Sequence, residues 1–204
     1  MLIFCNTIFH METEFYLRAI AEFEKSHKED PNFEYSNGEA IPAEWLYIQR
    51  LVNRLRTYRS TASEELILAA YCQHLYRWEI ARSDYPDGRM GYLEWRTFLA
   101  KYQSQKAAEI LARAGFSEQI ISRINSITLK DNLHNDEEAQ ALEDAVCLIF
   151  MEYYLEDFAL KNPHLEFKRI LFKTMDKMSK DGIAEALKIS FPEPIKEILK
   201  VIIR

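Results

Sequence analysis

The sequence predicts an all-α protein, a compact single-domain bundle of about seven to nine helices. Only five glycines and six prolines occur in 204 residues, so the chain has few of the breaks that many short strands need. Apolar residues recur at helical spacing, and no window alternates cleanly enough to require a strand. The apolar share of 48% is that of an ordinary globular domain that buries a core.

Turn residues define the first two predicted helices. A helix over residues 12–28 ends before an Asp-Pro pair, and residues 1–11 are expected to form a loose extension to a single domain of residues 12–204. A polar loop then leads to Pro42, whose fixed φ and missing N–H suit the first position of a second helix. The chain is therefore expected to begin with two helices joined by a loop.

Capping patterns define the next two helices. Thr61 and Glu64 have capping-box spacing, so a third helix is predicted to begin there and to run to about Ser83. A turn rich in Asp, Pro and Gly follows, and a fourth helix is predicted over residues 91–114. Gly115 is the expected C-terminal residue, because glycine readily adopts the left-handed conformation that ends a helix.

Serine and aspartate mark the starts of two later helices. Ser117 and Asp136 are predicted to cap a fifth and a long sixth helix, because such side chains accept hydrogen bonds from first-turn N–H groups. The sixth helix is predicted to end before Pro163. Pro194 is expected to open the last of the shorter helices that complete the chain.

Composition limits the classes of function. The net charge of −6 argues against a protein dominated by nonspecific binding to nucleic acid or anionic lipid. The three cysteines form no spaced framework, which indicates free thiols in a reducing compartment. No segment has enough consecutive apolar residues to span a membrane. We therefore expect a cytoplasmic protein with no membrane partner, for which a nucleic-acid partner is disfavoured.

Two predicted helices are apolar on nearly every face, over residues 66–72 and 145–151. Such helices are usually covered on several sides, so their polar residues are the informative ones. His74 shares an expected helix face with apolar neighbours, and Glu143 and Asp144 precede the second apolar run. These three residues are the predicted catalytic site.

The chemistry of this candidate site has three alternatives. If the two helices are neighbours, His74 can meet one of the two carboxylates, and such a His-carboxylate pair can bind a divalent metal. A His-carboxylate pair can also serve as acid and base. The simpler alternative is structural, because buried polar groups usually satisfy each other in the core.

Arginine and aromatic residues are interleaved close to His74. The guanidinium group of arginine can donate paired hydrogen bonds to a carboxylate or phosphate, and it stacks on aromatic rings. This segment therefore predicts an anion pocket near the turn at residues 84–91. The alternative is that the arginines pair with nearby carboxylates as structural ties. The predicted ligand-binding residues are Arg77, Arg82, Arg96, Trp78 and Tyr92.

A basic strip lies near the C-terminus, where Arg169, Lys173, Lys177 and Lys180 share helical spacing. Such a strip is usually a solvated helix face, although nucleic-acid binding would also use it. The chain has none of the common phosphate-loop, nucleophile-elbow or zinc-helix motifs. These absences remove several enzyme classes without selecting another.

Four ordered motifs carry a family resemblance. Together they resemble a bacterial and fungal family, domain of unknown function forty-two-oh-two, which has no established activity. The resemblance covers about residues 19–187 and rests on residues 73–82, 85–97, 140–148 and 173–179.

The family pattern is similar, more distantly, to the helical HD metal-dependent phosphohydrolases. That similarity implies an HD-like core in which His74 and Asp144 would hold a metal, with Glu143 beside them, and the metal would activate a water. The sequence departs from the family pattern at Gln103, where relatives often have histidine, and at Ala81, where they usually have proline. Glutamine is a poor ligand for a catalytic transition metal.

We therefore expect an internal His-carboxylate-Arg pocket that binds a phosphorylated small molecule or nucleotide. If the protein is an enzyme, the expected class is a metal-dependent phosphohydrolase with a divalent metal as cofactor. The rival hypothesis is a non-enzymatic interaction or scaffold protein whose motifs determine the fold.

Overall fold

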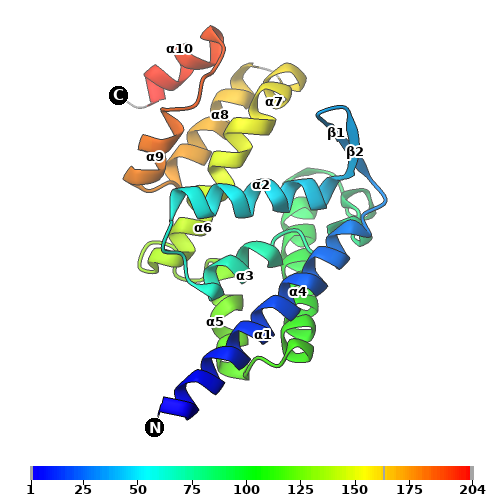
Figure 1. The fold of residues 1–204 in the computed structure, drawn as a ribbon. Coiled ribbons are helices and arrows are strands. Elements are labelled where there is room, and N and C mark those ends of the chain that lie inside the picture. Colours follow the sequence, from blue (N-terminus) through cyan, green and yellow to red (C-terminus); the bar gives the residue numbers. More distant parts are fainter. Residues whose placement is uncertain (1, 163, 203–204) are drawn as a thin grey trace.

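The computed structural model describes residues 2–162 and 164–202, and its helical architecture confirms the predicted fold class (Figure 1). In chain order the elements are α1 (Leu2–Lys28), β1 (Phe33–Ser36), β2 (Glu39–Pro42), α2 (Ala43–Tyr58), α3 (Glu64–Cys72), η1 (Arg77–Glu79), η2 (Arg82–Asp84), α4 (Gly88–Ala114), α5 (Glu118–Leu129), α6 (Glu137–Ile149), η3 (Phe150–Tyr154), α7 (Leu155–Lys161), α8 (His164–Asp176), α9 (Lys180–Ala186) and α10 (Glu193–Ile202).

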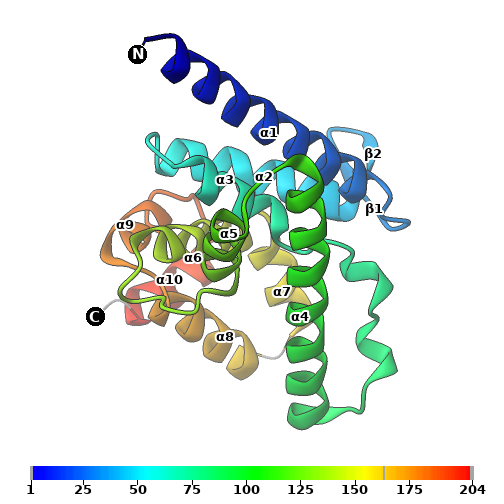
Figure 2. The same cartoon turned by 90° about the horizontal axis from the view of Figure 1, so that it is seen from below.

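Two apolar clusters organise these helices. The first cluster gathers buried side chains of α1 to α6, among them Phe23, Leu51, Leu68, Leu111 and Ile127. The second cluster gathers the end of α6 with η3 and α7 to α10, and includes Leu148, Leu155, Phe167, Leu171 and Ile195. Because α6 contributes to both clusters, it connects the α7–α10 layer to the rest of the molecule (Figures 1 and 2).

The predicted caps of α4, α5 and α6 are confirmed. Gly115 ends α4 with φ of 111°, and the side chain of Ser117 accepts a hydrogen bond from the N–H of Ile120. The side chain of Asp136 accepts from the first-turn N–H groups of α6. These caps were predictable because each joins residues only a few positions apart.

The α1 helix begins at Leu2, so residues 2–11, which were predicted to form a loose extension, have helical backbone. Met1 lies outside the described residues. Among the described residues, no helix is long and apolar enough to cross a membrane.

A β-hairpin replaces the polar loop predicted before Pro42. Strand β1 pairs antiparallel with β2, and Ser36 lies opposite Glu39. The two residues between them, Asn37 and Gly38, have φ of 53° and 84°. Asn-Gly is the preferred pair for such a two-residue turn, so the sequence contained a hairpin signal that the weak alternation concealed.

The third helix is much shorter than predicted. Ser63, rather than Thr61, caps α3, and the helix ends at Cys72 instead of about Ser83. His74 and Tyr76 then adopt the left-handed conformation, and short 3-10 turns follow. The helical face on which His74 was placed does not exist, because the chain leaves the helix before that residue.

The long sixth helix is divided by a π-helical segment. Helix α6 passes into η3 at Phe150, and an α-helix resumes as α7 at Leu155. Wider π turns are frequent at functional sites because they turn side chains out of the regular helical register. Here the segment carries Phe150 and Tyr154 into the wall of a cavity.

Candidate functional site

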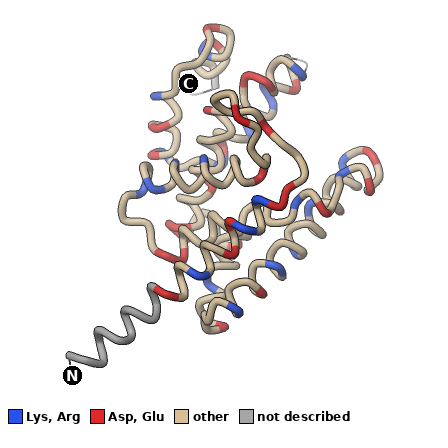
Figure 3. Tube along the Cα trace, turned by 45° about the vertical axis from the view of Figure 1, so that its right-hand side comes forward, with Lys and Arg blue, Asp and Glu red and all other residues tan. Residues whose placement is uncertain are grey.

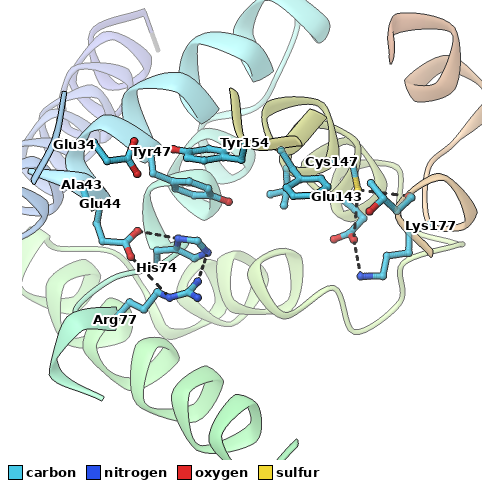
Figure 4. Close-up of a pocket in the computed structure, with 13 residues that line it drawn as sticks. Glu34, Ala43, Glu44, Tyr47, His74, Arg77, Glu143, Cys147, Tyr154 and Lys177 are labelled. Atoms are coloured by element: carbon cyan, nitrogen blue, oxygen red, sulfur yellow. Dashed lines mark hydrogen bonds and ion pairs between the residues drawn. The ribbon is translucent and has the colours of Figure 1, made fainter. Parts of the chain in front are cut away.

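His74 is the centre of a three-residue polar network between α2 and η1 (Figure 4). Its Nδ1 lies 2.8 Å from Oε2 of Glu44, which belongs to the first turn of α2. Nη1 of Arg77 lies 3.0 Å from Nε2 of His74. Nε of Arg77 lies 3.8 Å from Oε1 of Glu44, so each member of the network contacts the other two.

The donors of this network fix its protonation. A guanidinium only donates, so Nε2 of His74 accepts from Arg77 and Nδ1 carries the proton that it donates to Glu44. Burial lowers the pKa of His74, which keeps the ring neutral at pH 7 in agreement with that tautomer. Burial alone would raise the pKa of Glu44, but the hydrogen bond from His74 and the charge of Arg77 lower it.

Tyr47 extends the network toward the cavity. Its ring stacks on that of His74, with centroids 4.0 Å apart and planes inclined at 15°. No hydrogen bond joins its hydroxyl to another described residue, and the side chain lines the cavity. Burial and the charge of Glu44 raise the pKa of Tyr47, so its hydroxyl stays protonated and is available to a ligand.

The turn that positions His74 has a strained backbone. His74 and Tyr76 have φ of 60° and 52°, a conformation that costs a non-glycine residue about 1 kcal/mol or more. Leu75 between them is fully buried, and the hydroxyl of Tyr76 lies 2.8 Å from Oγ of Ser26. These tertiary contacts hold the turn, which directs His74 toward Glu44.

Glu143 lies across the cavity from His74, next to Lys177 (Figure 4). It forms ion pairs with Lys130 and with Lys177, the latter at 3.4 Å. Burial alone would raise the pKa of Glu143, but the two lysines lower it, so the group is a carboxylate. Burial raises the pKa of the adjacent Cys147 thiol to about 12, which makes it unreactive at neutral pH.

Asp144 is fully buried and faces a different set of partners. Its carboxylate accepts hydrogen bonds from the hydroxyl of Tyr58 at 2.7 Å and from Nε2 of Gln140 at 3.1 Å. It also accepts from the N–H and the hydroxyl of Ser179. Asp144 therefore joins α2 and α6 to the start of α9, and no described hydrogen bond links it to His74.

Two adjoining cavities, of about 470 and 360 Å³, lie beside these groups. The first extends toward Glu34 and Tyr154, and the second extends toward α4 and α5. Because they share part of their walls, we treat them as one site, the central pocket. The residues common to both walls are Tyr47, His74, Glu143, Val146 and Lys177.

Two polar side chains in the wall of the second cavity, Gln103 and Arg96, have groups without partners among the described residues. Nε2 of Gln103 is buried and has no hydrogen-bond partner among the described residues. Arg96, two turns earlier on α4, is an exposed residue that forms no ion pair with a described residue. Both side chains line this cavity together with Lys130, so donors and positive charge converge there.

The remaining predicted ligand residues lie outside the walls of the central pocket. Arg82 donates to the carbonyl oxygens of Tyr85 and Pro86, at 2.9 Å each, and so stabilises the turn before α4. Trp78 packs against Tyr76, and Tyr92 is about half exposed beside Trp95. Of the predicted arginines, only Arg77 and Arg96 line the central pocket.

The predicted metal pair finds no support in this arrangement. Within residues 2–162 and 164–202, no group of three or more histidine, cysteine, aspartate or glutamate side chains is placed to hold a metal ion. Both ring nitrogens of His74 are already hydrogen-bonded, one to Glu44 and the other to Arg77. The carboxylate of Asp144 accepts hydrogen bonds from Tyr58, Gln140 and Ser179. The donor set does not fit a shared metal on His74 and Asp144.

Comparison with known proteins gives a family without an assigned activity. A family model described as a domain of unknown function, DUF4202, matches residues 17–199. The chain belongs to the DUF4202 family. It matches no curated protein and no solved structure. The match covers every element of this DUF4202 protein that contributes to the central pocket.

Several pocket residues of this DUF4202 protein were missed by sequence reasoning. Glu44 and Tyr47 come from α2, where they look like ordinary members of an amphipathic helix. Lys130 has φ of 59° at the end of α5, and Lys177 was predicted only as part of a basic strip. No local pattern identifies them, because their partners are distant in the sequence.

Proposed function

We propose that this DUF4202 protein binds a phosphorylated small molecule in the central pocket. The observation that carries the proposal is the buried amide nitrogen of Gln103, which lacks a partner among the described residues and shares a cavity with Arg96. An unsatisfied buried donor costs about 1–3 kcal/mol, so a ligand that accepts its hydrogen bond recovers this energy. A phosphate group offers several acceptor oxygens and a charge that Arg96 complements.

The charge of the central pocket supports an anionic ligand. Its walls hold Arg77, Arg96, Lys130 and Lys177 against the carboxylates of Glu34, Glu44 and Glu143, in a chain whose net charge is −6. Three of these four cations are paired with carboxylates, which keeps the pocket from being strongly basic. In this proposal Arg96 supplies the free positive charge, and the paired lysines add a positive potential that ligand oxygens can share.

The two polar networks act in this proposal as positioning groups. Glu44 and His74 orient Arg77, and Glu143 orients Lys130 and Lys177. Preorganised cations lose less conformational entropy when a ligand binds. We therefore favour ligand binding over hydrolysis, since neither nitrogen of His74 is free to act as a base.

Isothermal calorimetry with inorganic phosphate, pyrophosphate and triphosphate tests the proposal. Arg96→Ala is expected to weaken binding about tenfold to a hundredfold, because it removes a charge-assisted contact. Arg89→Ala is the matched control, since Arg89 is an exposed arginine on the same helix outside the pocket walls. Failure of the wild-type protein to bind any of the three anions would refute the proposal, and so would equal losses in both variants.

Catalysis by His74, Glu143 and Asp144 stays a prediction with its own test. A panel of phosphate esters would be assayed with the wild-type protein and with His74→Ala. A catalytic role for His74 requires turnover that the substitution abolishes while thermal stability stays near the wild-type value. Turnover that persists in the variant would contradict that role.

The second candidate is protein binding through the outer face of α4. Met90 is 78% exposed there, and Leu93 and Phe98 are about half exposed, which places apolar area next to water. Met90→Lys with Leu93→Lys should abolish binding of a partner protein and leave anion affinity unchanged. A loss of anion affinity in this variant would count against the separation of the two surfaces.

A further inference from the structure

A third cavity, of about 570 Å³, lies where the β-hairpin faces η3 and α7. Its walls share Glu34, Phe150 and Tyr154 with the first cavity of the central pocket. The two spaces therefore adjoin across these three side chains.

Aromatic rings dominate the walls of the third cavity. Tyr153 is 46% exposed and Tyr35 is 81% exposed, which leaves two large ring surfaces in contact with water. The π turns of η3 present Phe150, Tyr153 and Tyr154 to the same space, although they are close together in the chain. Exposed rings at a cavity are suited to stacking on a planar ligand.

Arg50 fixes the geometry of these rings. Its guanidinium carbon lies 4.4 Å from the ring centroid of Tyr153 and 5.4 Å from that of Tyr154. It also donates to the hydroxyl of Tyr154 at 2.9 Å and to Oε2 of Glu34 at 3.2 Å. The aromatic wall, the hairpin and α2 are thereby tied together, so the rings are held in place before a ligand arrives.

The rim of the third cavity is polar. Asp157, Lys161 and Asn162 line it, and Asn162 uses its Nδ2 to donate to the carbonyl oxygen of Phe158 while its Oδ1 forms no described hydrogen bond. Asp157 and Asn162 offer acceptor oxygens, and Lys161 offers a donor, to the edge of a bound ring. A planar heterocycle can stack on the aromatic walls, and the donors and acceptors on its edge can form hydrogen bonds with the polar rim.

We infer that the third cavity is a nucleobase compartment and that the ligand of the central pocket is a nucleoside phosphate. The inference rests on the proposed function for the position of the phosphate. In this arrangement the base stacks on Tyr153 and Tyr35, and the phosphate lies toward Arg96 and Gln103. The sugar occupies the space near Tyr47 and Tyr154 that joins the two ends.

The test compares inorganic triphosphate with the four common ribonucleoside triphosphates by calorimetry in the presence of EDTA. At least one nucleotide is expected to bind about tenfold or more tightly than inorganic triphosphate, because base stacking adds to the phosphate contacts. Tyr153→Ala should remove this gain and leave the affinity for inorganic triphosphate unchanged. Tyr153→Phe should keep the gain, since it retains the ring.

The control is Tyr92→Ala, which removes a similarly exposed aromatic ring outside the three cavities. Equal affinity for inorganic triphosphate and all four nucleotides would overturn the nucleobase compartment while leaving the phosphate site intact. A gain that survives in Tyr153→Ala would also overturn it. If neither inorganic triphosphate nor any nucleotide binds, both the compartment and the proposed function fall.

Discussion

His27 is a fully buried imidazole near the end of α1. Its Nε2 lies 2.9 Å from the carbonyl oxygen of Tyr71, and its Nδ1 has no hydrogen-bond partner among the described residues. Burial lowers the pKa of His27 to about 4, because the charged ring would lose its hydration. The neutral ring therefore donates from Nε2 and ties α1 to the end of α3.

This histidine predicts a pH dependence of stability. As pH falls from about 6.5 to about 4, the unfolded chain binds a proton at His27 that the folded chain does not, so the free energy of unfolding falls. The loss from this residue approaches about 3 kcal/mol below pH 4. Urea unfolding across this range should show a shallower dependence in His27→Gln than in the wild type.

Exposed His134 provides the control for that measurement. His134→Gln makes the same replacement at an exposed position, so its profile gives the effect of a histidine-to-glutamine exchange outside the core. An identical profile for the wild type and His27→Gln would contradict the assignment. The comparison isolates the buried ring from the carboxylates that titrate over part of the same range.

The candidate site shows what single residues reveal in sequence. His74 and Glu143 were predicted as members of a polar site, and both line the central pocket. Asp144 was predicted beside them, yet it lies among Tyr58, Gln140 and Ser179. Because the three polar residues lie within or beside apolar runs, the sequence identified them as candidate buried polar groups. It could not predict which side chains each of them would contact.

At the scale of elements, Gly91 sets how the turn before α4 folds. A Cβ at this position would lie 1.9 Å from the carbonyl oxygen of Pro86, which belongs to that turn. The same oxygen accepts a hydrogen bond from Arg82 at 2.9 Å. The turn therefore lies against the helix only because residue 91 has no side chain.

We predict that Gly91→Ala destabilises the protein by about 2–4 kcal/mol, because backbone atoms of the turn must move away from α4. Chemical denaturation measures the change, with Arg89→Ala on the same turn of α4 as the control. A change near zero in the free energy of unfolding would show that the turn can move away from α4 without destabilising the protein. The sequence predicts only that a helix starts at this glycine, whereas α4 begins at Gly88.

Helix α3 is shorter than predicted because tertiary contacts outweigh the helical preference of the residues that follow it. Helix α3 ends at Cys72 although the following residues are compatible with a helix. Buried Leu75 and the hydrogen bond from Nε1 of Trp95 to the carbonyl oxygen of Ile80 hold the next segment in tight turns. Such contacts between distant positions leave no periodic trace in the sequence.

At the scale of the molecule, the shared helix α6 predicts a single cooperative unfolding transition. It contributes Leu142 to the first cluster and Leu148 to the second, both fully buried. The three tryptophans, Trp45, Trp78 and Trp95, all precede α5, so their fluorescence reports on the first part of the chain. Far-ultraviolet circular dichroism reports on helices of both clusters.

We expect the two signals to give the same urea midpoint and the same slope. Leu148→Ala should shift both curves together by about 2–5 kcal/mol, because a cavity in the second cluster weakens the common unit. A fluorescence transition that stays in place while circular dichroism shifts would instead indicate two domains. That outcome would also contradict the predicted single domain of residues 12–204.

Charges of both signs are distributed over the molecule. Figure 3 shows lysine and arginine interspersed with aspartate and glutamate along the described chain. In the C-terminal strip, Arg169 pairs with Glu166 at 2.5 Å and Lys177 pairs with Glu143, so two of the four basic side chains have acidic partners. This mixing favours a local anion pocket over an extended surface for nucleic acid.

The sequence by itself determined the helical class and the caps at Ser117 and Asp136. Each depends on composition or on hydrogen bonds between residues a few positions apart. Only the tertiary structure decided that His74 faces Glu44, thirty positions away, and that Gln103 and Arg96 share a cavity. Pairing across such distances follows from how helices pack, because packing selects which polar groups meet and which stay free to bind a ligand.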